Sequence, residues 1–538
     1  MKKTDENMKV RNADGFMSGV LVLSFSTILV KIIGLAVKIP MLSVLGAVGM
    51  GYFNSAVELY ALLCTVSTSG LPVALSMLIS ANRERGDMAA VRRVYKNAKL
   101  LFLALGVCGS CAMLVFSEEI ALLIGNSSAR LSIVAISPAV LLICISSAVR
   151  GYFQGFENMV PTAISQIIEA AGKLVLGVGL GVAALKIGAE LPVAAGASVL
   201  GLTIGILLST LYLSYKKIRD RRAVNIKTNY AHKENGDVGM LLKIALPITL
   251  SSAILSFCRI IDMALILRRL QETGISETEA GGIYGAYTTL AVPVFALVPA
   301  LITPISLSLV PRLSSAIECG DKSSQAEVSD RAQRLTVLLT MPASMGIALY
   351  STQILSLLFS GQEAAVSVAA PLLSVLGISV LFSGMITTTN AILQSYRQTV
   401  RPIVSMAIGS AVKIVAAYLL IGIPEIGVYG APISTLLCNF TVTAINLIFL
   451  KRRIPTGNKD SGVWQMLGRP FLASLFAIAA SYASYLGMLR LTSEQSISFL
   501  IAFFFAIVAY AVFALLFGAL KTEDMAEIPL LQKFIRIK

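Results

Sequence analysis

Charged residues inside long apolar segments are the part of this 538-residue sequence that could do chemistry. Each ionisable group costs about 2.5–3.5 kcal/mol at the centre of a membrane helix unless water or a partner charge stabilises it. The basic residues of this kind are Lys31, Lys38, Lys173, Arg259 and Lys413, and the acidic ones are Glu58, Glu169 and Asp262. Five basic groups facing lipid would cost as much as the stability of a typical domain. We therefore expect them to face a wet cavity or partner charges.

Two acid–base pairs have helical spacing. Glu169 precedes Lys173 by four residues, and Arg259 precedes Asp262 by three, so each pair can interact along its own helix. Such pairs are equally consistent with a purely structural role and with a place in a functional site.

The remaining cations have no acid at helical spacing. Lys31 and Lys38 are seven residues apart and share one helical face, and Lys413 is the only charged residue of its segment. A basic cavity selects negatively charged ligands such as phosphates and repels cations. We predict substrate-binding cavity cations at Lys31, Lys38, Arg259, Lys413 and Lys173, ion-coupling or charge-pairing acids at Glu58, Glu169 and Asp262, and an outer rim at Arg268 and Arg269.

The elements that must position these residues are membrane helices. The sequence is 56% apolar and 14% charged, whereas an ordinary soluble domain is about 25% charged. Apolar segments of about 20 residues follow one another, which is the length a helix needs to cross a bilayer. The fourteen predicted spans are 16–42, 52–80, 99–117, 131–149, 160–185, 191–215, 241–267, 283–311, 335–359, 366–393, 402–422, 428–450, 468–489 and 496–520.

The net charge of +15 is explained by membrane topology. Most Lys and Arg residues fall in the two tails and in alternate loops, which is the positive-inside pattern and places both termini in the cytoplasm. The expected counter-charges are anionic membrane lipids, and no nucleic-acid partner is predicted.

Internal spacing suggests a duplication. Gln154 precedes Lys173 by 19 residues, and Gln394 precedes Lys413 by the same 19. We predict an all-α integral membrane protein with two six-helix lobes, related as a parallel pseudo-repeat, plus two C-terminal helices. The predicted divisions are a cytoplasmic N-tail (1–15), an N-lobe (16–215), a basic cytoplasmic loop (216–240), a C-lobe (241–450), a cytoplasmic linker (451–467), the last two spans (468–520) and a cytoplasmic C-tail (521–538).

The sequence contains no motif for an enzyme or a metal site. The single histidine is His232, the seven cysteines are scattered, and no GxxxxGK[ST] loop is present. We expect no metal, cofactor or catalytic residue, and transport driven by the membrane potential or by a coupling ion.

Four stretches resemble the stage V sporulation protein B and polysaccharide exporter family, in the superfamily that also holds MurJ-type lipid II flippases and MATE exporters. They are Lys31–Pro40 (KIIGLAVKIP), Leu45–Tyr52 (LGAVGMGY), Gly70–Ala74 (GLPVA) and Arg150–Gln166 (RGYFQGFENMVPTAISQ). The resemblance implies an alternating-access transporter of the bacterial cytoplasmic membrane that acts as a monomer. It also implies a pyrophosphate-linked substrate bound by Lys31, Lys38, Arg259 and Lys413.

Three hypotheses follow. The first is a flippase for an undecaprenyl-pyrophosphate-linked oligosaccharide, with the peptidoglycan precursor lipid II as the leading substrate. The second is a MATE-like ion-coupled exporter of small molecules, which the surplus of intramembrane Lys and Arg disfavours. The third is a membrane scaffold for wall-synthesis enzymes, which should tolerate the loss of Lys31 and Arg259.

Overall fold

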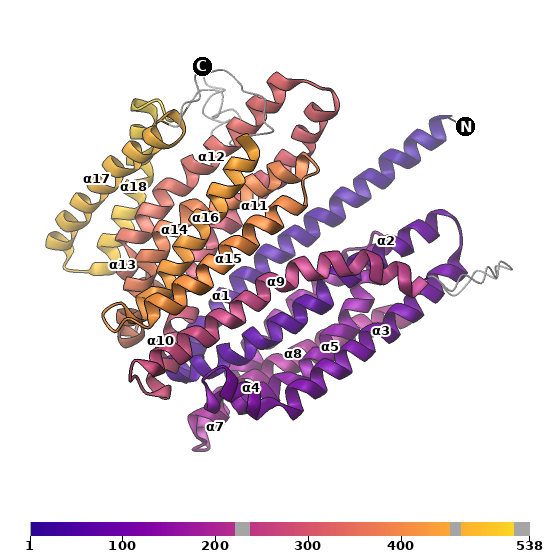
Figure 1. Ribbon diagram of the computed structural model, residues 1–538, viewed down its shortest axis with the longest axis horizontal. Coiled ribbons are helices and arrows are strands. Elements are labelled where there is room, and N and C mark those ends of the chain that lie inside the picture. Colours follow the sequence, from indigo (N-terminus) through magenta and orange to yellow (C-terminus); the bar gives the residue numbers. More distant parts are fainter. Residues whose placement is uncertain (1, 221–236, 452–463, 521–538) are drawn as a thin grey trace. The chain divides into compact units, whose positions relative to one another are not determined.

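The computed structural model describes residues 2–220, 237–451 and 464–520, and every regular element in those ranges is a helix (Figure 1). The longer helices are α1 (Lys2–Thr68), α2 (Gly70–Glu84), α3 (Met88–Val115), α5 (Arg130–Gly155), α6 (Val160–Gly172), α7 (Val178–Lys186), α8 (Leu191–Arg219), α9 (Asp237–Glu272), α10 (Glu277–Ala286), α11 (Val292–Glu318), α12 (Lys322–Leu349), α14 (Glu363–Ser395), α15 (Val400–Ile421), α16 (Gly430–Lys451), α17 (Arg469–Thr492) and α18 (Gln495–Leu516). Short helices are α4 (Ser117–Leu123), α13 (Ser351–Leu358), the 3-10 turns η1 (Ser127–Ala129) and η5 (Gly427–Tyr429), and the π-turns η2 (Lys173–Gly177), η4 (Tyr287–Ala291) and η6 (Trp464–Gly468). The all-helical membrane fold is thus confirmed.

Within the described ranges, twelve helices are long and apolar enough to cross a membrane. The number rises to thirteen if α12 and α13, which meet at an 80° bend, form one broken span. The predicted count of fourteen stays a prediction.

The segment Ile32–Glu84 is 53 residues long and contains the predicted span 52–80 and the final part of the predicted span 16–42. Gly46 interrupts α1 with a non-helical backbone (φ 63°, ψ 179°), a conformation that glycine adopts without steric cost. The charge of Glu58 acts on Lys38, although a straight helix would hold the two residues about 30 Å apart. The break at Gly46 therefore bends the chain and brings them closer.

The chain forms two compact units, Met1–Gly285 and Ala286–Lys538. In the first unit α5 packs against α1, α2, α3 and α8, and α9 packs on α1 and α2. An aromatic group centred on Tyr152, whose ring lies 5.1 Å from that of Tyr95, fills the core at one end of α5. Packing thus groups α9 with the first unit, and the predicted lobe bounds, which follow chain order, stay a prediction.

In the second unit α14 packs against α11, α12 and α16. The helices α17 and α18 lie side by side, and α17 packs on α12 (Figure 1). Two tyrosine hydroxyls connect these helices: Tyr510 donates to the Leu338 carbonyl at 2.7 Å, and Tyr350 lies 2.9 Å from the Ser481 hydroxyl.

The two units repeat one packing scheme. The helix pairs α3–α5, α5–α8 and α6–α8 of the first unit correspond to α12–α14, α14–α16 and α15–α16 of the second. A short helix, α4 or α13, follows α3 and α12 respectively. A threonine hydroxyl crosses from α8 to α5 and from α16 to α14: Thr210 bonds to the Leu142 carbonyl at 3.3 Å, and Thr443 bonds to the Phe382 carbonyl at 3.1 Å, with the acceptors 240 and the donors 233 residues apart. The internal pairing supports the duplication inferred from the sequence.

Candidate functional site

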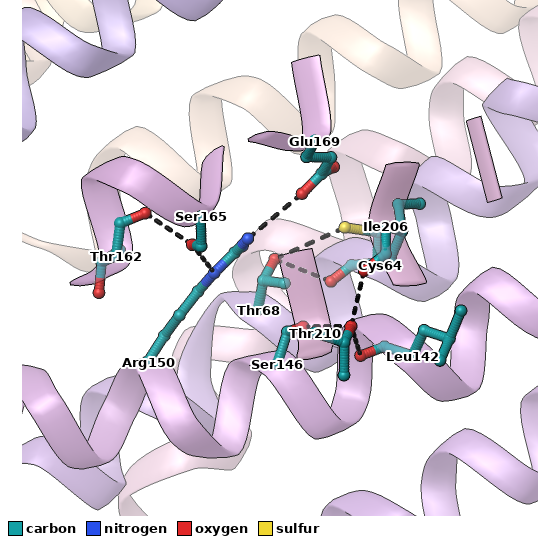
Figure 2. A network of polar contacts seen from close by, with 10 residues as sticks. All are labelled: Cys64, Thr68, Leu142, Ser146, Arg150, Thr162, Ser165, Glu169, Ile206 and Thr210. Carbon is teal, nitrogen blue, oxygen red and sulfur yellow. Dashed lines mark hydrogen bonds and ion pairs between the residues drawn. The ribbon is translucent and has the colours of Figure 1, made fainter. Parts of the chain in front are cut away.

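Arg150 and Glu169 form an ion pair between α5 and α6. The guanidinium Nη2 lies 3.2 Å from the carboxylate Oε2, and Nε donates to the Ser165 hydroxyl at 3.1 Å. Ser165 in turn donates to the Thr162 carbonyl at 2.7 Å, as Figure 2 shows. The side chains of the pair are 11% and 26% exposed, so both charges are largely withdrawn from solvent.

Lys173 is the first residue of the π-turn η2, one turn beyond Glu169. Its ammonium lies 5.6 Å from the ring centroid of Phe53, a cation–π distance. The charges of Glu169 and Glu58 also act on it. Glu169 therefore makes its close ion pair with Arg150 on another helix, while Lys173 interacts with Phe53 and with both carboxylates.

Two glycine contacts hold this π-turn against α8. A Cβ on Gly172 would come within 2.4 Å of Gly205 Cα, and a Cβ on Gly201 within 2.4 Å of the Gly177 nitrogen. Small residues at such crossings let two membrane helices approach closely. Glycines at these positions thus allow the close packing that holds the backbone of Lys173 in place.

Lys38 joins the same group from α1, because the charges of Lys173 and Glu58 act on it. We call Lys38, Glu58, Arg150, Glu169 and Lys173 the charged cluster. It contains three cations and two carboxylates, which leaves a formal surplus of one positive charge. Glu58 Oε2 is buried and has no hydrogen-bond partner, so this oxygen is available to a ligand.

Arg259 lies on α9 and its side chain is exposed. Its Nη2 donates to the Ser256 hydroxyl at 2.9 Å, and that hydroxyl lies 3.0 Å from the hydroxyl of Thr65 on α1. Neither of these two hydrogen bonds connects Arg259 to a residue of the charged cluster. Its pairing with Asp262 and its role in binding stay predictions.

The residues predicted for the outer rim make structural contacts. Arg268 donates to the Leu122 carbonyl at 3.0 Å, and Arg269 forms an ion pair with Glu272. Gln271 adds a 2.6 Å bond to the Gly125 carbonyl, so α9 is tied to the turn after α4. Whether this end faces the outside stays a prediction.

The places of two further predicted cations in a binding site stay predictions. Lys413 lies partly buried on α15 of the second unit, at the position that corresponds to Lys173. The side chain of Lys31 lies outside the described residues.

Sequence reasoning missed Arg150 and Phe53. Arg150 lies inside α5 and is the less exposed member of its ion pair. The sequence signal for this ion pair was the spacing between Arg150 and Glu169. These residues face each other if α5 and α6 form a hairpin.

Comparison with known proteins places the chain among membrane transporters. A model described as "Polysaccharide biosynthesis protein" matches residues 16–317, and the MatE model matches residues 247–419. Stage V sporulation protein B of Bacillus subtilis is 24% identical over 97% of this chain and 99% of its own length. Lipid II flippase MurJ of Bacillus subtilis is 25% identical over 81% of this chain and 82% of its own. A solved structure of lipid II flippase MurJ in an inward closed conformation has a TM-score of 0.70 at 17% identity, and covers 92% of this chain and 98% of that one.

Proposed function

This chain belongs to the polysaccharide biosynthesis protein family of the MOP superfamily, a family of membrane transporters rather than enzymes, and we propose that it is a flippase for an undecaprenyl-pyrophosphate-linked saccharide. It moves this lipid from the inner to the outer leaflet of a bacterial cytoplasmic membrane, with both chain termini in the cytoplasm. Lipid II is the leading substrate, because a relative that is similar over most of both chains is named a lipid II flippase.

The charged cluster is the observation that carries this proposal. Lys38, Arg150 and Lys173 come from three helices of one unit and gather around the carboxylates of Glu58 and Glu169. Cations at membrane depth are costly, and a surplus is expected only where an anion or water compensates it. A pyrophosphate linked to a lipid is an anion that must pass through that depth.

We propose different roles for these cations. Arg150 is occupied by Ser165 and Glu169, so its part is to hold Glu169 and position α6. Lys38 and Lys173 share the remaining acid, Glu58. These two lysines are therefore the cluster residues proposed to contact phosphate.

The proposal includes an alternating-access cycle of a monomer, driven by the membrane potential or by a coupling ion. A membrane potential supplies about 2.3 kcal/mol per charge per 100 mV, which is sufficient to reorient an empty, positively charged cluster.

Translocation of fluorescent lipid II in vesicles tests the proposal. Vesicles with the full chain should lose inner-leaflet lipid II faster than protein-free vesicles, and undecaprenyl pyrophosphate should compete. A rate equal to that of protein-free vesicles at every membrane potential would refute the flippase.

A second candidate is an ion-coupled exporter of small molecules. It is favoured by the MatE match over residues 247–419 and by the buried, unpartnered Glu58 Oε2, which could take a proton or a metal cation. Drug-driven proton or sodium flux that disappears in Glu58→Gln, together with the absence of lipid II translocation, would favour this candidate over the flippase.

A further inference from the structure

The second unit contains an open cavity of about 430 Å³ among α11, α14, α15 and α16. Its lining side chains, all within the described part of the chain, are hydroxyls, amides and apolar groups with no charge among them. The polar ones include Ser383, Thr387, Asn390, Gln394 and Asn439. A volume in the range of about 300–1,000 Å³ is typical of small-molecule sites.

This cavity contains the duplicate of part of the charged cluster. Asn390 lies 240 residues after Arg150, the offset that also relates Gln154 to Gln394 and Lys173 to Lys413. The second unit therefore has an amide where the first unit has a guanidinium.

The contacts around the duplicate support the equivalence. Ser165 donates to the Thr162 carbonyl at 2.7 Å, and the Ser405 hydroxyl oxygen, 240 residues later, lies 3.0 Å from the Pro402 carbonyl oxygen. Gly409 occupies the position of Glu169, so the second unit has neither charge of the ion pair. The same backbone frame thus holds an ionic group in one unit and a neutral one in the other.

A buried amide fixes how Asn390 is oriented. Asn446 is fully buried and accepts a 2.6 Å bond from Ser405 at its Oδ1. Its Nδ2 donates to Asn390 Oδ1 at 2.8 Å and to the Thr389 hydroxyl at 3.0 Å. Because Asn390 Oδ1 is engaged, its Nδ2 hydrogens are left to donate to a ligand.

Asn439 has the opposite arrangement. Its Nδ2 donates to the Ser379 hydroxyl at 2.8 Å, so its Oδ1 is left to accept. Thr387 and Thr303 each give their proton to a carbonyl of their own helix, at 3.2 Å, and keep oxygen lone pairs as acceptors. The cavity therefore offers donors and acceptors together, without charge.

A ligand that satisfies such a cavity is neutral and carries many hydroxyl or amide groups. An anion would be desolvated with no cation among the lining residues, and a cation with no carboxylate. A purely apolar guest would leave the amides of Asn390 and Asn439 unsatisfied. A sugar ring presents donors and acceptors around its edge and meets both amides.

We propose that the cavity of the second unit is a saccharide subsite, which binds the sugar part of a lipid-linked substrate through Asn390 and Asn439. This inference rests on the proposed function. It assigns the neutral half of the substrate to the second unit and leaves the charged half to the charged cluster of the first.

The test measures binding of two lipids to the purified full chain in nanodiscs: undecaprenyl pyrophosphate and the same lipid with its disaccharide. Asn390→Leu and Asn439→Leu should each weaken binding of the saccharide-bearing lipid about fivefold, as expected for one neutral hydrogen bond. Binding of the bare pyrophosphate lipid should not change. Asn97→Leu, on α3 of the first unit, is the matched control and should change neither.

Asn390→Leu also removes a hydrogen bond to Asn446, so a second kind of variant is needed. Thr387→Val keeps the side-chain volume and removes one cavity hydroxyl without touching that bond. It should show the same selective weakening. Equal affinity of wild type and all three cavity variants for the saccharide-bearing lipid, or equal weakening for both lipids, would overturn the subsite alone. Failure of the wild type to bind either lipid would instead overturn the proposed function and the subsite with it.

Discussion

Glu157 and Arg397 adopt the same left-handed backbone conformation, each with φ of 59°, at turns that lie 240 residues apart. The residue after each closes the same bond: Asn158 N–H donates to the Phe153 carbonyl at 3.0 Å, and Gln398 N–H to the Leu393 carbonyl at 2.9 Å. These turns end α5 and α14, the central helices of the two units.

The charges at the two turns are reversed. Glu157 lies 3.8 Å from Arg83 near the end of α2, and Arg397 lies 3.6 Å from Glu318 at the end of α11. The duplicated backbone has therefore been kept while the signs of the ion pair were exchanged. Geometry at this turn, rather than a particular charge, is what both units share.

Glycine at either turn should stabilise the protein. A non-glycine residue in the left-handed region costs about 1 kcal/mol or more, whereas an exposed ion pair contributes about 0–1 kcal/mol. Glu157→Gly and Arg397→Gly should each raise the unfolding temperature in detergent by about 1–3 °C. Glu157→Ala is the control, because it loses the ion pair without relieving the backbone. A lower unfolding temperature for both glycine variants would show that the ion pairs matter more than the strain.

Replacing only one partner of the Arg150–Glu169 ion pair should strongly lower the stability of the folded protein. Arg150→Met removes the only close ion-pair partner that the described residues give the partly buried Glu169 carboxylate, and breaking a buried pair of this kind costs about 3 kcal/mol or more. The double variant Arg150→Met, Glu169→Gln should recover most of that loss, as measured by thermal unfolding.

Arg83→Met serves as the control for this cycle, since its ion pair is exposed and its loss should change stability by less than about 1 kcal/mol. If the double variant were as unstable as Arg150→Met alone, Arg150 would act through packing and not through its charge.

The close crossing of η2 and α8 should not tolerate a methyl group. In Gly201→Ala the new Cβ would lie 2.4 Å from Gly177 N and from the Leu176 carbonyl carbon. Overpacking of this kind costs about 1–3 kcal/mol and shifts backbone. We expect lower stability and slower transport, because the displaced π-turn carries Lys173.

Gly179→Ala is the matched control for that substitution. A Cβ on Gly179 meets nothing within 4 Å, and alanine is the better helix former by about 1 kcal/mol. Normal transport and equal or higher stability are expected. Equal damage from both alanine variants would argue against the close crossing.

Neutralising the cluster lysines should impair transport more than stability. Lys38→Met and Lys173→Met keep side-chain volume and remove a charge proposed to meet phosphate, so translocation of a pyrophosphate lipid should fall by about tenfold or more. Lys186→Met, at the exposed end of α7, should transport normally. If both cluster variants translocated the pyrophosphate lipid at the wild-type rate, the charged cluster would not be part of the binding site.

The sequence by itself determined the helices, the class of protein and the duplication. Hydropathy and length act locally, so the predicted spans fall on helical segments, although the count of fourteen stays a prediction. The 240-residue offset between Lys173 and Lys413 indicated the repeat. The unusual placement of Lys38, Glu58 and Lys173 in apolar segments was also readable, because an intramembrane charge is costly in any fold.

Only the tertiary structure decided which of these charges meet. Arg150 pairs with Glu169 because α5 and α6 form a hairpin, and the charge of Glu58 reaches Lys38 because α1 bends at Gly46. The structure likewise identified Asn390 as a candidate binding residue, because Asn446 on another helix orients its amide. Contacts of this kind depend on how each helix is rotated and how closely its neighbour packs, and residue spacing along one chain does not specify either.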